Sequence, residues 1–124
     1  MPVLDTSVLI ELIRNTELGQ KALKEIGNDA VAITPFTAHE ILIGHDSKMM
    51  QLLGQFEVVD YGFDDAVESA GIEKELISKG RLISRTDVFI AGICRRQNLE
   101  LVTADKDFLN VKGLKVKLIS STRK

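Results

Sequence analysis

Short apolar runs along the chain alternate with longer segments in which apolar residues recur every three or four positions. Short runs rich in β-branched residues are typical of buried strands, whereas the wider spacing is typical of helices with one apolar face. The predicted strands are residues 2–4, 30–33, 56–61, 99–103 and 114–119. The predicted helices are residues 8–13, 18–26, 34–45, 48–53 and 64–79, a helix that starts at Ser84 and carries Ile90, Ala91 and Cys94, and a brief turn or helix at 107–109.

The alternation of strands and helices predicts the fold class. Each crossover between parallel strands places a helix on a face of the sheet. We therefore expect an α/β fold, a three-layer α/β/α sandwich with a mostly parallel five-stranded sheet. The chain has no internal repeat and no Pro/Ser-rich linker, so residues 1–124 are expected to form a single domain. In the helix at 64–79, we expect Val67, Ala70 and Ile77 to face the core and Gly80 to end the helix.

The composition of the chain narrows its class. A chain of 124 residues buries about two-thirds of its unfolded surface, so it needs neither disulfides nor a structural metal to fold. Its lone Cys94 excludes an intramolecular disulfide framework, a Cys-rich zinc site and an iron–sulfur cluster, and fits a reducing compartment. The apolar runs are too short to span a bilayer, and the first residues lack the basic segment of a secretion signal. We expect a cytoplasmic protein with no membrane partner.

The charge of the chain is divided unevenly. The formal net charge is −2, but residues 1–78 hold 5 Lys/Arg and 14 Asp/Glu, whereas residues 79–124 hold 11 and 4. Near-neutrality excludes binding to nucleic acid by bulk positive charge alone. The basic last third is consistent with a path for a polyanionic substrate, with an ordinary solvated face as the alternative for each residue. The candidate contacts with such a substrate are Arg81, Arg85 and Lys106, which together with Arg95 and Arg96 flank the candidate acidic residues in the sequence.

Two carboxylates follow predicted strands. Asp5 comes directly after the first strand, and Asp105 follows the fourth. In open parallel sheets, ligands bind outside the carboxyl ends of the strands, where these two residues would lie. Asp is also a good helix N-cap, so capping is the alternative interpretation of each residue.

Two further acids lie on predicted helices. Glu40 lies four residues after Phe36 and three before Ile43, on the face expected to pack inward. A buried carboxylate without a partner costs several kcal/mol, so an acid at that position suggests a function. Asp87 opens the helix that starts at Ser84, which directs its carboxylate toward the sheet edge. The alternatives are a solvated helix rim for Glu40, and capping or dipole stabilisation for Asp87.

Four acids at one sheet edge require a cation, because like charges repel and raise one another's pKa. Mg²⁺ or Mn²⁺ suits carboxylate and water oxygens, whereas zinc is less suited without a Cys or His cluster. Such an ion binds phosphate oxygens and activates water near neutral pH. The four acids therefore indicate phosphodiester hydrolysis.

Four segments of the chain together resemble the PIN domain family, and more closely its single-domain VapC-type toxins. The resemblance covers essentially the whole chain and depends on the order and spacing of four motifs. The motifs are Val3-Leu4-Asp5-Thr6-Ser7-Val8-Leu9-Ile10, Thr37-Ala38-His39-Glu40-Ile41-Leu42-Ile43-Gly44, Thr86-Asp87-Val88-Phe89-Ile90-Ala91 and Leu101-Val102-Thr103-Ala104-Asp105-Lys106-Asp107-Phe108.

This resemblance implies a metal-dependent endoribonuclease, the toxin of a toxin–antitoxin pair, with Mg²⁺ or Mn²⁺ as cofactor. Its catalytic and metal-binding residues would be Asp5, Glu40, Asp87 and Asp105. Asp5 and Asp105 would bind the principal ion, Asp87 would share it or hold a second one, and Glu40 would orient water or complete a two-metal site. Thr6 and Thr103 are candidates to support the acids by hydrogen bonding, with helix capping and strand propensity as the alternative.

The resemblance also implies partners. Related toxins dimerise and are inhibited by a small cognate antitoxin, so we expect an RNA substrate, a homodimer and an antitoxin partner. Candidate contact residues for the partner are Leu9, Leu12, Ile13, Met49, Met50 and Leu53, although core packing explains most of them equally well. We expect Asp107 to serve a turn, and His39 and His45 to be structural or surface residues.

Two other functions remain open at this stage. One is a phosphatase with Asp5 as nucleophile, which fits less well because Ser7 stands where haloacid-dehalogenase-like enzymes carry a second Asp. The other is a catalytically inactive PIN-like RNA-binding or scaffold protein. Retention of four mutually repelling acids counts against that alternative.

Overall fold

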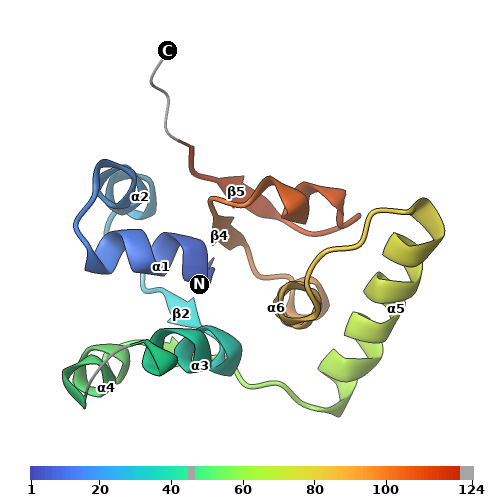
Figure 1. Ribbon diagram of the computed structural model, residues 1–124, viewed down its shortest axis with the longest axis horizontal. Helices are drawn as coiled ribbons and strands as arrows, with labels where there is room; N and C mark the ends of the chain where they lie inside the picture. The colour runs from blue at the N-terminus through green and yellow to red at the C-terminus, as the bar shows by residue number, and fades with distance from the viewer. Residues whose placement is uncertain (45–46, 121–124) are drawn as a thin grey trace.

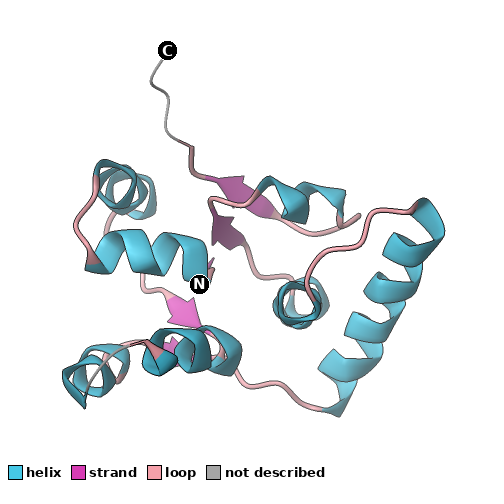
Figure 2. Cartoon of the chain, viewed as in Figure 1, coloured by secondary structure: helices cyan, strands magenta, loops and turns pink. Residues whose placement is uncertain are grey.

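The computed structural model describes residues 1–44 and 47–120, which form a layered α/β fold (Figure 1). The elements in chain order are β1 (Val3–Leu4), α1 (Thr6–Ile13), α2 (Glu17–Ile26), β2 (Ala32–Ile33), α3 (Pro35–Ile43), α4 (Ser47–Leu53), β3 (Glu57–Val58), α5 (Phe63–Lys79), α6 (Arg85–Gln97), β4 (Leu101–Thr103), the 3₁₀ helix η1 (Lys106–Asn110) and β5 (Val116–Leu118). The predicted strands and helices are all present, but the strands are shorter than the apolar runs that indicated them (Figure 2).

The sheet has five strands in the order β3-β2-β1-β4-β5, and each neighbouring pair is parallel. Val3 of the central strand pairs with Ala32 on one side and Leu101 on the other, and Leu4 pairs with Val102. Every strand therefore ends at the same edge of the sheet. This arrangement confirms the predicted α/β/α sandwich and places Asp5 and Asp105 at the carboxyl ends of adjacent strands.

Successive residues of the central strands point to opposite faces and divide the core in two. Val3, Ala32 and Leu101 pack with residues of α5, α6 and η1. Leu4, Ile33 and Val102 pack instead with residues of α1, α2, α3 and α4. The helices thus form the two outer layers of the sandwich (Figure 1). No helix in the described part of the chain is long and apolar enough to cross a membrane.

Helix α5 is rotated relative to the sequence prediction. The buried face carries Asp65, Ser69, Ile72 and Leu76, at the spacing of one helical stripe. Val67 and Ile77 are 58% and 57% exposed and Ala70 is also exposed, so the expectation that this stripe faces the core is wrong. The cause is that α5 has apolar residues on both sides, and packing on α6 selects the side that contains two polar residues. Gly80 ends the helix in the left-handed conformation, as expected.

Helix α3 also presents a different face from the one expected. Thr37 and Ile41 are buried, whereas Ile43 is 75% exposed and Glu40 is exposed. The prediction that Glu40 lies on an inward face is therefore wrong. Residues 37 and 41 are one turn apart, so their burial turns position 40 to the rim of the helix. The predicted helix end near His45 lies outside the described residues.

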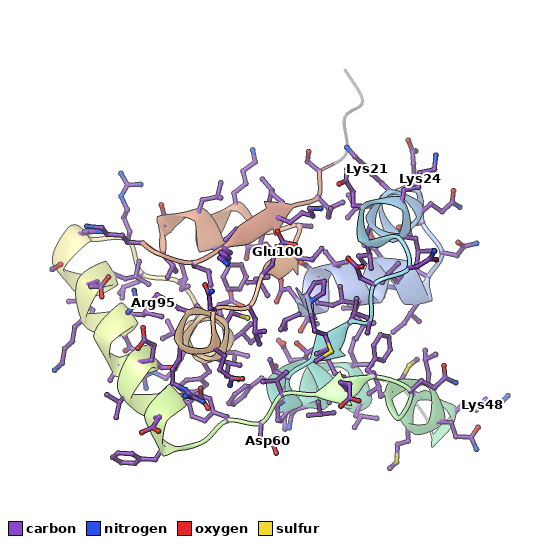
Figure 3. All side chains as sticks on the ribbon, turned by 180° about the vertical axis from the view of Figure 1, so that it is seen from behind. Lys21, Lys24, Lys48, Asp60, Arg95 and Glu100 are labelled. Atoms are coloured by element: carbon purple, nitrogen blue, oxygen red, sulfur yellow. The ribbon has the colours of Figure 1, made fainter. Side chains whose placement is uncertain are left out.

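Helices α5 and α6 are joined by ion pairs as well as by apolar contacts. Arg95 Nε lies 2.6 Å from Glu68 Oε2, and Arg95 Nη2 lies 3.4 Å from Glu75 Oε2, which places Arg95 between the two helices (Figure 3). Arg96 Nε lies 2.6 Å from Asp65 Oδ1. Arg95 and Arg96 thus form ion pairs that join the two helices.

Candidate active site

Asp5 occupies the turn between β1 and α1. Its backbone N–H donates to the carbonyl of Val102 on β4, and its side chain is buried, with 4% exposure. Asp5 holds the N-cap position of α1, but its carboxylate makes no hydrogen bond to the helix amides. The capping alternative for Asp5 therefore fails.

Two hydroxyl groups bind the Asp5 carboxylate instead. The hydroxyl of Thr103 donates to Asp5 Oδ2 at 2.8 Å, and the hydroxyl of Ser7 donates to the same oxygen at 2.8 Å. Both donors are neutral, so they orient the carboxylate without cancelling its charge. The supporting hydrogen bond expected of Thr103 is present in the structure.

Asp105 lies at the carboxyl end of the neighbouring strand β4. It is the N-cap of η1, and its Oδ1 accepts a hydrogen bond from the backbone N–H of Asp107 at 2.9 Å. The capping interpretation of Asp105 is thus correct for one oxygen. Capping does not exclude a second role, because a carboxylate has two oxygens and several lone pairs. Asp107 lies in the first turn of η1, and its side chain is exposed.

Glu40 reaches the site from the rim of α3. The hydroxyl of Thr6 donates to Glu40 Oε1 at 2.7 Å and lies 3.1 Å from the hydroxyl of Thr37. Thr37 is buried one turn before Glu40. Thr6 therefore contacts both the exposed acid of α3 and a buried residue of the same helix. Thr6 thereby joins the start of α1 to α3.

Asp87 lies in the first turn of α6, where its backbone N–H donates to the N-cap hydroxyl of Ser84 at 3.2 Å. Burial, together with repulsion from the negative charges of three other residues, raises the pKa of Asp87 to about 6, although a hydrogen bond with Ser84 opposes this rise. The three repelling residues are Asp5, Asp105 and Glu40. The four acids predicted from separate segments therefore lie in one electrostatic neighbourhood.

The chemistry of this cluster fits a hard divalent cation. None of the ion pairs found among the described residues includes any of the four acids. Within the same part of the chain, no three His, Cys, Asp or Glu side chains stand close enough, as placed, to share one ion. The donors are all oxygens, which Mg²⁺ and Mn²⁺ prefer.

The remaining candidate residues lie on the surface. Arg85 is exposed and pairs with Glu73 at 2.9 Å, and Arg81 donates to Asn110 Oδ1 at 3.3 Å. Lys106, next to Asp105, is exposed. His39 is exposed on α3, which agrees with a surface role.

Two hydroxyl residues at the site, Ser7 and Thr37, escape prediction from the motifs. Ser7 contacts Asp5 and also Thr103, 96 positions away in the chain. Thr37 is completely buried beside Thr6. A small hydroxyl residue two or three positions from an acid is the sequence signal for each, and the same signal marks an ordinary helix start.

The apolar candidates for a partner surface divide into two groups. Leu9 of α1 and Leu53 of α4 are buried in the core, so they are not available to a partner. Leu12, Ile13 and Met49 are half-buried against the same core, and Met50 is 64% exposed. Core packing is thus the better explanation for most of this group.

Comparison with known proteins places the chain in a family. The family model described as PIN domain matches residues 3–114. The chain is 26% identical over 123 residues to a protein of Shigella flexneri named tRNA(fMet)-specific endonuclease VapC, and the match covers 91% of this chain and 93% of that protein.

Solved structures show the same fold. VapBC2 from Rickettsia felis, bound to a DNA fragment from its promoter, gives a TM-score of 0.79 at 21% identity over 94% of this chain and 96% of the other. VapBC-5 from Mycobacterium tuberculosis, a member of the VapBC family of toxin–antitoxin systems, gives a TM-score of 0.72 at 26% identity over 97% and 98%.

Proposed function

This chain belongs to the PIN domain family, and we propose that it is a metal-dependent endoribonuclease that hydrolyses RNA phosphodiester bonds, the toxin of a VapBC-type toxin–antitoxin system. The observation that supports the proposal best is the repulsion that Asp5, Asp105 and Glu40 together exert on Asp87. A partly buried cluster of negative charges that has no ion-pair partner among the described residues is unfavourable unless a cation joins it. The proposal treats residues 1–124 as one nuclease domain.

In this proposal, Asp5, Asp87 and Asp105 hold the ion, and Glu40 orients water or completes the metal site. A bound divalent ion supplies charge stabilisation at the phosphate and lowers the pKa of water. Thr103 fixes the rotation of the Asp5 carboxylate, and Thr6 keeps Glu40 at the rim of the site. Mg²⁺ and Mn²⁺ are the proposed cofactors because all four side chains offer hard oxygen ligands.

The proposed partners follow from the comparisons. The curated relatives are named endonucleases that act on tRNA(fMet), and the solved neighbours include VapBC assemblies, so we propose an RNA substrate and a small antitoxin partner for this chain. We also propose a homodimer and a cytoplasmic location. Arg81, Arg85 and Lys106 are the proposed RNA contacts, because their side chains are exposed and basic.

The decisive experiment incubates the purified chain with total RNA and with initiator tRNA, in Mg²⁺, in Mn²⁺ and in EDTA. We expect cleavage only with the metal ions. Asp5→Asn should lower the rate about 100-fold or more, which is the usual effect of removing one charge-stabilising group from an active site. Asp60→Asn is the matched control, because Asp60 is exposed and does not contribute to the repulsion on Asp87 (Figure 3).

Cleavage that persists both in EDTA and in Asp5→Asn contradicts the proposal. A chain that binds RNA without cleaving it in either metal supports the inactive RNA-binding alternative. A phosphate adduct in the intact mass after exposure to acetyl phosphate supports the phosphatase alternative. Loss of cleavage when the product of a small adjacent gene is added supports the antitoxin partner.

A further inference from the structure

The first turn of α1 carries a hydroxyl that connects two strand ends. Ser7 is only half-buried and lies two residues after Asp5, but its oxygen contacts residues 96 and 97 positions away. The hydroxyl donates to Asp5 Oδ2 at 2.8 Å, and the same oxygen accepts the backbone N–H of Ala104 at 3.1 Å. Ser7 is thus bonded both to an acid after β1 and to the turn after β4.

Thr103 makes a second link of the same kind. Its hydroxyl donates to Asp5 Oδ2 at 2.8 Å and accepts the backbone N–H of Asp105 at 3.0 Å. Two parallel chains therefore run from consecutive backbone amides, through one hydroxyl each, to a single carboxylate oxygen. The hydroxyl oxygens of Ser7 and Thr103 lie 3.3 Å apart, so the two chains also contact each other.

This arrangement fixes two acids as one unit. Because both hydroxyls converge on Oδ2, they set the rotation of the Asp5 carboxylate. Ser7 accepts a hydrogen bond from the backbone N–H of residue 104, and Thr103 accepts one from that of residue 105. The two hydroxyls therefore also hold the backbone of Asp105 against Asp5. Hydrogen bonds to a carboxylate are stronger than those between neutral groups, and linked hydrogen bonds strengthen one another.

We propose that Ser7 is a positioning residue that, together with Thr103, sets the Asp5 carboxylate and the Asp105 turn in register for divalent-cation binding. This inference rests on the proposed function, because it assigns Asp5 and Asp105 to the same cation. Ser7 acts through Asp5 and Ala104 and does not itself touch the reacting phosphate. The alternative is that Ser7 only stabilises the first turn of α1, as a small polar residue at a helix start commonly does.

The test measures Mn²⁺ affinity from the electron paramagnetic resonance signal of the free ion. Ser7→Ala should weaken Mn²⁺ binding by about 10-fold or more, because the loss of a partner that orients a metal ligand typically costs 10–100-fold in affinity. Ser7→Thr keeps a hydroxyl and should recover most of the affinity. Ser78→Ala is the matched control, since Ser78 is exposed on α5 and its hydroxyl donates to the carbonyl of Glu75 on the same helix.

Thr103→Val provides a second variant if Ser7→Ala fails to fold. It should also weaken Mn²⁺ binding, and the two substitutions combined should cost less than the product of their separate effects, because both act on Asp5 Oδ2. Independent, multiplicative effects contradict a shared role.

A metal-free readout separates this inference from the proposed function. The Asp105 amide has its own acceptor in Thr103, so a purely local role of Ser7 leaves its hydrogen exchange unchanged in EDTA. We expect the exchange of that amide to accelerate in Ser7→Ala. If the wild type binds Mn²⁺ and Ser7→Ala binds it with the same affinity, the inference about Ser7 is overturned and the proposed function stands. Absence of Mn²⁺ binding in the wild type overturns the proposed function, and the exchange rate of the Asp105 amide then decides whether Ser7 joins the two strand ends.

Discussion

At the scale of single residues, Thr6 joins an exposed acid to the body of the protein. Glu40 is a flexible side chain at the rim of α3, and an unrestrained glutamate samples many rotamers. The hydroxyl of Thr6, 2.7 Å away, selects the rotamers that keep the carboxylate near the start of α1. The repulsion that Glu40 exerts on Asp87 shows that this position lies within the field of the acidic cluster.

Thr6→Val, which keeps the shape of Thr6 and removes its hydroxyl, tests this connection. We expect RNA cleavage to fall about 10-fold, the lower end of the effect of removing an orienting partner, while the free energy of unfolding falls by only about 1 kcal/mol. Steady-state cleavage and urea denaturation measure the two effects, and Thr6→Ser is the control that keeps the hydroxyl. Wild-type cleavage by Thr6→Val contradicts the role assigned to this hydrogen bond.

The sequence predicts some residues of the site better than others. Asp5 and Asp105 are predictable because parallel strands must end at one sheet edge, whatever the details of packing. The rim position of Glu40 is not, because it depends on which face of α3 packs, and that is a tertiary property. Ser7 is hidden for a different reason. A serine in a first helical turn is common, and its contacts with the distant Thr103 and Ala104 distinguish this one.

At the scale of elements, α5 shows why periodicity alone can give the wrong face. The helix has an exposed apolar stripe, while its buried face contains Asp65 and Ser69. Gly92 of α6 explains part of the choice, since a Cβ added there would overlap the Ser69 side chain. A close approach of two helices at small residues cannot be deduced from one helix alone. Asp65 becomes acceptable on the inside because it binds Arg96.

Asp65 near the start of α5 forms an ion pair with Arg96 of α6, and this ion pair predicts how the stability of the fold depends on pH. Burial favours the neutral form of Asp65, but hydrogen bonds from Arg96, the Gly62 amide and Gln97 outweigh it and hold its pKa below the usual value. A carboxyl with a lowered pKa in the folded state stabilises the fold above its unfolded pKa. That contribution is lost as pH falls below about 4, through the folded pKa.

Asp65→Asn should therefore lower the free energy of unfolding by about 2–3 kcal/mol at pH 7, because it removes charge-assisted hydrogen bonds to a buried group. The difference between wild type and variant should shrink as the pH falls from about 4 toward 3. Urea denaturation at both ends of this range measures it, with Asp64→Asn on the exposed side of the same turn as control. A difference that does not depend on pH contradicts an ionic origin.

At the scale of the whole molecule, the packing of α5 on α6 offsets part of the uneven charge along the chain. Acidic residues of the first part of the chain pair with three arginines of the last part: Glu73 with Arg85, Glu68 and Glu75 with Arg95, and Asp65 with Arg96. The sequence reveals the imbalance but not these partners, because pairing depends on the helix faces. The four acids at the sheet edge remain outside this neutralisation. They are the part of the charge pattern that calls for an external cation.

The last prediction concerns the stability of the metal-free chain. Because burial and three neighbouring charges raise the pKa of Asp87 to about 6, its ionised form opposes folding at pH 7. Asp87→Asn removes that charge, so it should raise the free energy of unfolding in EDTA by about 1 kcal/mol, allowing for the partial exposure of the side chain.

Mg²⁺ should stabilise the wild type, since an ion that binds only the folded state shifts unfolding by mass action, and should stabilise Asp87→Asn much less. Thermal unfolding of both chains in EDTA and in Mg²⁺ measures these effects, with Asp60→Asn as the charge-matched control. If Asp87→Asn is less stable than the wild type in EDTA and gains as much from Mg²⁺, the acids are not a strained cluster that a cation relieves.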